Sequence, residues 1–172
     1  MKLKIKVCGM KHAANIAAVA ELLPNYMGFI FYEKSPRYIS EVSAELIKYV
    51  PQEIKTVGVF VDEILTNVKA TIAKHHLKAV QLHGKESVDF CKDVKQTTGV
   101  EVIKAFGVSG DFDFSILEAY ETAVDYFLFD TQTPAHGGSG KVFDWTLLES
   151  YKLAKPYFLS GGIDLQHAER IR

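Results

Sequence analysis

The hydrophobic positions of this chain gather in short continuous runs rather than alternating with polar positions. Seven such runs recur, and each is followed by a stretch with the spacing of an amphipathic helix. Strands that are covered on both faces are uniformly apolar in this way, as in parallel sheets flanked by helices. The pattern therefore predicts an α/β fold in which strand and helix alternate.

The runs and the stretches between them predict fourteen elements. Strands are expected near Lys4–Val7, Tyr26–Phe31, Lys55–Phe60, Ala79–Leu82, Val100–Ala105, Tyr126–Phe129 and Tyr157–Leu159. Helices are expected near Ala13–Leu23, Ser43–Tyr49, Glu63–His75, Glu86–Gln96, Phe114–Ala119, Asp144–Tyr151 and from Leu165 to the end. Asp62 and Asp164 precede two of these helices and can cap them, because a carboxylate accepts hydrogen bonds from free backbone N–H groups.

The strand–helix units follow one another without interruption, but there is one unit fewer than in a closed barrel. No linker or low-complexity tract divides residues 1–172, so a single domain is expected. A closed (β/α)₈ barrel has eight strand–helix units and usually at least about 200 residues. The chain stops at Arg172, within a helix-like stretch that lacks a C-terminal cap signal. We therefore expect the domain to be C-terminally short by about one βα unit.

Composition and charge narrow the class of protein. With 48% hydrophobic residues the chain can bury one sizeable core. Its formal net charge of -1 gives no excess of basic residues that would indicate binding to nucleic acid or to an anionic membrane surface. No signal peptide is evident, and no apolar run approaches the roughly 20 residues of a membrane-spanning helix. The two cysteines, Cys8 and Cys91, lie far apart in the sequence. A cytoplasmic protein without a disulfide is expected.

Chemically reactive residues follow three of the predicted strands. Cys8-Gly9 follows the first, Asp130-Thr131 the sixth and Ser160-Gly161-Gly162 the seventh. Parallel strands end at the same edge of their sheet, and barrel enzymes place their active sites at this edge. The sequence therefore predicts an enzyme.

Seven short motifs follow one another along the chain. They are Lys6-Val7-Cys8-Gly9-Met10, the segment 31–39 with Ser35-Pro36-Arg37, Val57-Gly58-Val59-Phe60, Gln81-Leu82-His83-Gly84, Phe129-Asp130-Thr131, Gly137-Gly138-Ser139-Gly140 and Leu159-Ser160-Gly161-Gly162-Ile163. Over the whole chain this set resembles the phosphoribosylanthranilate isomerase family of tryptophan biosynthesis. The resemblance implies a (β/α)₈ TIM barrel and an Amadori rearrangement of N-(5-phosphoribosyl)anthranilate without a cofactor. Family members continue through an eighth strand and helix, which this chain lacks.

The resemblance also implies roles for individual residues. An Amadori rearrangement protonates the ring oxygen of the sugar and removes a proton from C2, so it needs an acid and a base on opposite sides of one sugar. By resemblance Cys8 is the general base and Asp130 the general acid. We expect the pKa of Asp130 to be raised, because apolar neighbours disfavour the charged carboxylate.

Binding residues complete the expected site. Arg37 is expected to bind the anthranilate carboxylate, since a guanidinium forms bidentate bonds with such groups, and His83 is expected to contact the substrate. Two glycine-rich loops, with Gly138, Ser139, Gly161 and Gly162, are expected to present backbone N–H groups to the phosphate. The histidines show no metal-ligand spacing, so no metal is expected.

Other interpretations of the same residues remain open. Free cysteine usually packs as a small hydrophobe, which is how we interpret Cys91 and how Cys8 could also be interpreted, and Asp130 could merely cap a turn. Cys8 could instead be a nucleophile with His83 as its base, as in thiol hydrolases. A weakly active or inactive barrel fragment that binds sugar phosphate is a further alternative. The expected partner is a small phosphorylated molecule, bound by a monomer or homodimer.

Overall fold

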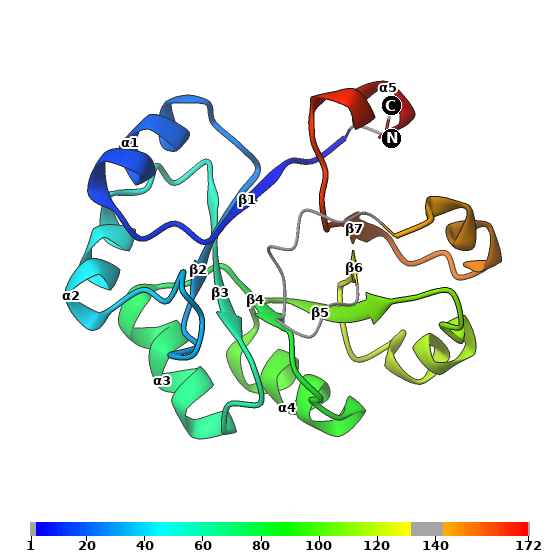
Figure 1. Cartoon of the computed structure of the whole chain (residues 1–172). Coiled ribbons are helices and arrows are strands. Elements are labelled where there is room, and N and C mark those ends of the chain that lie inside the picture. The colour runs from blue at the N-terminus through cyan, green and yellow to red at the C-terminus, as the bar shows by residue number, and fades with distance from the viewer. Residues whose placement is uncertain (1–2, 132–142, 172) are drawn as a thin grey trace.

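The structure is a computed structural model that describes residues 3–131 and 143–171. Seven parallel strands form one sheet in sequential order. They are β1 (Lys6–Cys8), β2 (Tyr26–Ile30), β3 (Lys55–Phe60), β4 (Ala79–Leu82), β5 (Glu101–Val108), β6 (Tyr126–Thr131) and β7 (Tyr157–Leu159). All seven predicted strands are confirmed, and Figure 1 shows the sheet curled round with the helices on its outer side. The α/β fold of TIM-barrel type is thus confirmed, with seven strands in the part of the chain described.

The connections between the strands are helical. They are α1 (Ala13–Glu21), α2 (Glu41–Ala44), η1 (Glu45–Tyr49), α3 (Leu65–His75), α4 (Val88–Thr98), η2 (Phe114–Tyr120), η3 (Trp145–Ser150), η4 (Leu165–His167) and α5 (Ala168–Ile171). The segments η1 to η4 are 3₁₀ helices, a geometry that proteins use for short pieces. The segments η2 and η3 therefore stand where the sequence predicted helices near Phe114–Ala119 and Asp144–Tyr151, but both are 3₁₀ helices.

One of the two predicted caps is confirmed. Asp164 accepts a hydrogen bond from Gln166 N at 3.0 Å and begins η4. The prediction for Asp62 is wrong, because α3 begins after Ile64 without a side-chain cap. Asp62 has a left-handed backbone (φ 51°), and its carboxylate accepts from Lys85 N in the next loop instead.

The sheet is buried on both faces, as the apolar runs predicted. Buried apolar side chains form two clusters. A small inner cluster lies inside the curl, and a larger outer cluster lies between the sheet and the helices. The inner cluster consists of Tyr26, Val57, Ala79, Ile103, Ala105 and Leu128. Side chains alternate along a strand, so Gln81 and Asp130, each two residues beyond an inner residue, also face inward. This parity brings polar side chains from separate strands to one end of the curled sheet.

Candidate active site

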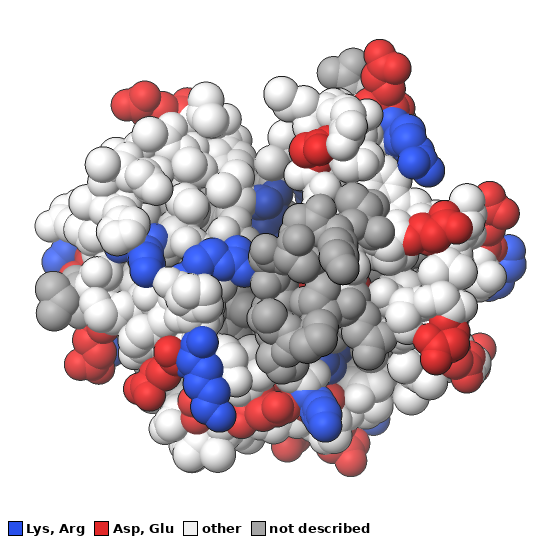
Figure 2. Space-filling model, viewed as in Figure 1, with Lys and Arg blue, Asp and Glu red and all other residues white. Residues whose placement is uncertain are grey.

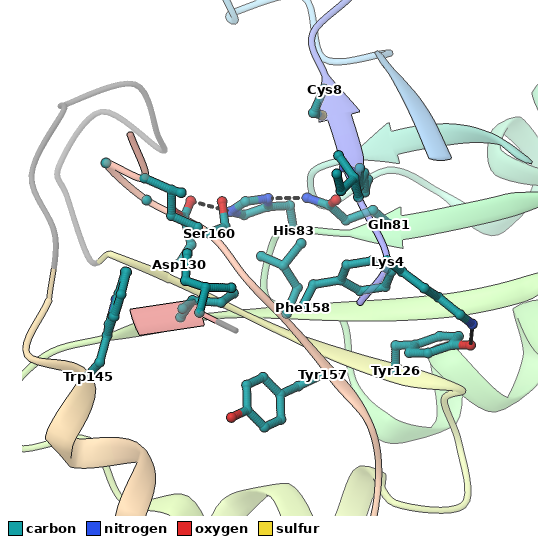
Figure 3. Close-up of a pocket in the computed structure, with 18 of the residues that line it drawn as sticks. Lys4, Cys8, Gln81, His83, Tyr126, Asp130, Trp145, Tyr157, Phe158 and Ser160 are labelled. Carbon is teal, nitrogen blue, oxygen red and sulfur yellow. Dashed lines mark hydrogen bonds and ion pairs between the residues drawn. The ribbon is translucent and has the colours of Figure 1, made fainter. Parts of the chain in front are cut away.

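A pocket of about 2420 Å³ runs along β1 and β7, from Lys4 and Pro156 near their amino ends to the carboxyl ends of the strands. Its lining includes every predicted site residue that the structure describes, namely Cys8, Arg37, His83, Asp130, Gly161 and Gly162. Figure 3 shows Cys8 on one side of this pocket and Asp130, His83 and Ser160 across from it. Gly138 and Ser139 lie outside the described residues. The structure thus brings six expected site residues together, although their roles stay predictions.

Cys8 is held at the end of β1 by its glycine neighbours. Gly9 has a left-handed backbone (φ 90°), and its N–H donates to Gly28 O at 2.9 Å. Cys8 is paired with Gly28 in β2, where an added Cβ would stand 2.7 Å from the Cys8 sulfur. The absence of a side chain at Gly28 therefore leaves room for a half-buried thiol that faces the pocket.

Asp130 is only 7% exposed, yet it is well provided with hydrogen-bond donors. Its Oδ1 accepts from Thr131 N at 3.0 Å, and its Oδ2 lies 3.5 Å from Nε2 of His83. Burial raises the pKa of this carboxyl, but the hydrogen bond and charge of His83, with hydrogen bonds from Thr131 and Ser160, outweigh it and lower the pKa from its ordinary value. The expected raised pKa is therefore wrong for the free protein, because donors on three segments outweigh desolvation.

Gln81 links His83 to the interior of the barrel. Its Nε2 lies 2.7 Å from His83 Nδ1. If this amide nitrogen donates, Nδ1 accepts and the ring proton sits on Nε2, facing Asp130. Both ring nitrogens of His83 are thus engaged by Gln81 and Asp130, which counts against a Cys8–His83 dyad. Gln81 was not among the predicted site residues, although a position two residues before His83 at the end of β4 is expected to point its side chain the same way.

Arg37 reaches the pocket from the loop between β2 and α2. Its backbone N–H donates to Ser35 Oγ at 3.2 Å, and Lys11 Nζ donates to Pro36 O at 2.7 Å. The Arg37 side chain crosses over Gly9, where an added Cβ would stand 2.7 Å from its Cδ. The loop is therefore tied down so that the guanidinium lies beside the Cys8-Gly9 turn. Figure 2 shows Lys and Arg side chains to the left of the centre of this face and below it, with Asp and Glu side chains below and to the right, and the cations favour an anionic ligand.

The loop after β7 approaches Asp130 very closely. Gly161 and Gly162 both have left-handed backbones, with φ of 91° and 64°. A Cβ on Gly161 would stand 2.7 Å from Thr131 N and 2.8 Å from Asp130 Oδ1. Only glycine permits this approach, which also places Ser160 beside the carboxylate of Asp130.

Two kinds of feature do not occur in residues 3–131 and 143–171. No group of three or more His, Cys, Asp or Glu side chains in them is arranged to hold a metal ion. No helix among them is long and apolar enough to cross a membrane. Cys91, interpreted from the sequence as a packing residue, is fully buried in the outer core, and burial raises its pKa to about 12.

Comparison with known proteins identifies relatives across nearly the whole chain. The family model described as N-(5'-phosphoribosyl)anthranilate (PRA) isomerase matches residues 5–171. The N-(5'-phosphoribosyl)anthranilate isomerase of Parabacteroides distasonis is 44% identical over 170 residues, covering 98% of this chain and 76% of the relative. That of Phocaeicola vulgatus is 40% identical over 159 residues, covering 92% of this chain and 75% of the relative.

Solved structures agree with the sequence matches. The phosphoribosyl anthranilate isomerase of Thermotoga maritima has a TM-score of 0.82 at 36% identity, covering 94% of this chain and 78% of its own. A phosphoribosyl anthranilate isomerase in complex with reduced 1-(o-carboxyphenylamino)-1-deoxyribulose 5-phosphate has a TM-score of 0.82 at 30% identity, covering 98% of this chain and 80% of its own. Fold, family model and relatives agree: the chain belongs to the phosphoribosylanthranilate isomerase family and is an isomerase.

Proposed function

We propose that this chain converts N-(5-phosphoribosyl)anthranilate to 1-(2-carboxyphenylamino)-1-deoxyribulose 5-phosphate by an Amadori rearrangement. The observation that carries the proposal is the placement of Cys8 and Asp130, which face one pocket from β1 and β6. A solved relative that binds the reduced form of this product supports the substrate class.

Asp130 acts as the general acid that opens the ribose ring. It donates a proton to the ring oxygen, the bond from C1 to that oxygen breaks, and the anthranilate nitrogen forms a protonated imine with C1. In the free protein the pKa of Asp130 is lowered from its ordinary value by His83, Thr131 and Ser160, which favours the ionised carboxyl. The substrate brings a phosphate and a carboxylate, and such like charges raise the pKa of a nearby carboxyl. Asp130 therefore takes up its proton as the substrate binds.

Cys8 acts as the general base in the next step. Its thiolate removes the proton from C2, the C2–H electron pair forms the C1–C2 double bond, and the imine electrons return to nitrogen. The resulting enolamine becomes the ketone by gaining a proton at C1 and losing one from the C2 hydroxyl. Base and acid must lie on opposite sides of the sugar, which the positions of Cys8 and Asp130 across the pocket allow.

The remaining site residues bind the two ends of the substrate. Arg37, at the mouth beside the Cys8-Gly9 turn, binds the anthranilate carboxylate. Gly161 and Gly162, whose backbone after β7 borders the pocket, present N–H groups to the phosphate. Gly138 and Ser139 contribute to the same phosphate site, and His83 contacts the substrate from beside Asp130.

The setting of the activity is also part of the proposal. The chain needs no cofactor for this chemistry and acts in the cytoplasm on a small phosphorylated molecule, with no nucleic-acid or membrane partner. It acts as a monomer or homodimer, in keeping with the Thermotoga maritima relative, which is described as dimeric and for which monomers were also generated.

Turnover by the unaltered chain tests the proposal directly. N-(5-phosphoribosyl)anthranilate is generated from anthranilate and the ribose diphosphate donor, and its loss is followed by fluorescence while mass spectrometry and NMR identify the product. We expect the 2-ketose product to appear at a rate proportional to protein concentration. Substrate loss that yields only free anthranilate, the product of spontaneous hydrolysis, would contradict the proposal.

A further inference from the structure

Lys6 brings an ammonium group to the thiol of Cys8. The two residues are separated by one position in β1, so their side chains lie on the same face of the strand, and both line the pocket. Gly28 on the neighbouring strand lies between them. An added Cβ there would stand 2.7 Å from the Cys8 sulfur and 3.2 Å from Lys6 Nζ. The missing side chain at Gly28 therefore allows the sulfur and the ammonium nitrogen to approach the same point.

Three other lysines in or near the sheet have partners, whereas Lys6 has none among the residues that the structure describes. Lys4 Nζ donates to Tyr126 OH at 2.8 Å. Lys55 pairs with Glu101, and Lys104 pairs with Glu86 at 3.1 Å. Within residues 3–131 and 143–171, the ammonium of Lys6 has neither a hydrogen-bond acceptor nor an ion-pair partner. A half-buried cation that faces a pocket and has no partner among the described residues is suited to bind a ligand oxygen.

We propose that Lys6 is a further catalytic residue, whose ammonium donates a hydrogen bond to the C2 hydroxyl oxygen of the substrate. This inference rests on the proposed function, in which Cys8 removes the proton from C2. The hydroxyl oxygen is bonded to that same carbon, so a donor beside the Cys8 sulfur is close to it.

The hydrogen bond assists two successive events. While C2 loses its proton to Cys8, a cationic donor withdraws electron density from the C2 oxygen and disperses the charge that develops at C2. When the enolamine becomes the ketone, the C2 oxygen loses its proton and becomes a carbonyl acceptor, which binds the same donor more strongly. Lys6 keeps its own protons throughout, so the overall reaction remains an isomerisation with all atoms and electrons accounted for.

Binding of two ligands distinguishes a hydrogen bond from Lys6 to the C2 hydroxyl from a general attraction of anions by its charge. The first ligand is the reduced product, which carries a hydroxyl at C2, and the second is its counterpart without that hydroxyl. Calorimetry with Lys6→Met should show the first ligand bound about 10- to 100-fold more weakly, the range for a lost charge-assisted hydrogen bond, and the second changed by less than about threefold. Lys4→Met is the matched control two residues before Lys6, because its ammonium is bound to Tyr126. It should leave both affinities within about twofold.

A kinetic isotope effect tests the same role during turnover. Substrate with deuterium at C2 should react more slowly than ordinary substrate to a greater extent in Lys6→Met than in the unaltered chain, because loss of the donor makes proton removal slower. Lys4→Met should leave the isotope effect unchanged. A Lys6→Met chain that loses affinity for both ligands equally, or for neither, or that turns over without a larger isotope effect, would overturn the inference.

These outcomes also separate the inference from the proposed function. If Cys8→Ser keeps full turnover, or if the unaltered chain binds neither ligand, the proposed function itself is wrong. If Cys8→Ser loses turnover and Lys6→Met changes neither the ligand pair nor the isotope effect, only the role of Lys6 is wrong.

Discussion

Nε2 of His83 lies 3.5 Å from Oδ2 of Asp130, so an imidazole at the end of β4 contacts a carboxylate on β6. The His83 side chain is 20% exposed and that of Asp130 is 10% exposed, which places the pair at the boundary between core and pocket. Desolvation alone would raise the pKa of Asp130, and the contact with His83 is the largest of the effects that lower it. The pair therefore determines whether the expected acid is ionised before substrate arrives.

Replacing His83 should raise the pKa of Asp130. In His83→Leu the hydrogen bond and the charge of the imidazole are lost while most of the burial remains, so we expect the lowered pKa of Asp130 to rise. A carbon NMR titration of the Asp130 carboxyl measures this shift. Asp111→Asn, an exposed change in a loop, should not alter the titration. An unchanged pKa in His83→Leu would mean that Thr131 and Ser160 alone hold the carboxyl ionised.

Removing the thiol should abolish most turnover. Cys8→Ser keeps the size of the side chain but replaces an ionisable thiol by a hydroxyl, so we expect kcat to fall by at least about 100-fold, the lower range for a positioned general base. The measurement is the fluorescence assay of substrate loss. Cys91→Ala is the matched control, since the Cys91 thiol is fully buried and its raised pKa, about 12, keeps it protonated. Near-complete turnover in Cys8→Ser would remove Cys8 from the mechanism.

Removing the acid should affect kcat more than substrate binding. Asp130→Asn preserves the shape of the side chain but cannot deliver a proton to the ring oxygen, so ring opening becomes rate-limiting. The lost interaction belongs mainly to the transition state, hence we expect kcat to fall by about 100-fold or more while KM changes little. Steady-state kinetics of the two chains measures both constants. A loss confined to KM would indicate that Asp130 binds substrate without donating a proton.

A buried ion pair supports the loop that carries His83. Lys104 Nζ lies 3.1 Å from Glu86 Oε2, both side chains are at most 3% exposed, and Glu86 accepts from Gly84 N at 2.9 Å. Removing one partner of such a pair leaves an uncompensated charge, so Lys104→Met should reduce the free energy of unfolding by about 3–5 kcal/mol. Urea denaturation measures the change.

Two further variants test whether the loss of stability in Lys104→Met comes from the uncompensated buried charge. The double change Lys104→Met with Glu86→Gln removes both charges and should recover part of the loss. Lys48→Met breaks the pair with Glu45, in which both side chains are 57% exposed, and should change the free energy of unfolding by no more than about 1 kcal/mol. Equal losses of unfolding free energy in the Lys104 and Lys48 variants would show that the buried pair stabilises the fold no more than the exposed pair does.

The position of the site could be predicted from the sequence because parallel strands end at one edge. That rule alone brings Cys8, His83 and Asp130 together, and the apolar runs locate their strands to within a few residues. The ionisation of Asp130 could not be predicted, since its donors come from β4 and from the loop after β7, far away in the sequence. Lys6 and Gln81 were passed over for a similar reason. A polar residue inside a strand resembles a surface position until the parity of its neighbours shows that it faces the interior.

The last prediction concerns the glycine beside Asp130. In Gly161→Ala the new Cβ would stand 2.7 Å from Thr131 N and 2.8 Å from Asp130 Oδ1, so the loop after β7 must move away from the carboxylate. We expect lower turnover and about 10-fold or greater loss of affinity for the reduced product, equivalent to one charge-assisted hydrogen bond to its phosphate. Calorimetry and the turnover assay measure the two effects.

Gly99→Ala is the matched control for Gly161→Ala. Gly99 also has a left-handed backbone (φ 68°), but nothing lies within 4 Å of its added Cβ. This variant should lose only about 1–2 kcal/mol of stability, because a residue with a Cβ is disfavoured in a left-handed backbone, and should keep its affinity and turnover. The comparison therefore separates backbone strain, which both variants share, from the close approach to Asp130, which Gly161 alone requires. If both variants bind the reduced product as the unaltered chain does, the loop after β7 is not part of the phosphate site.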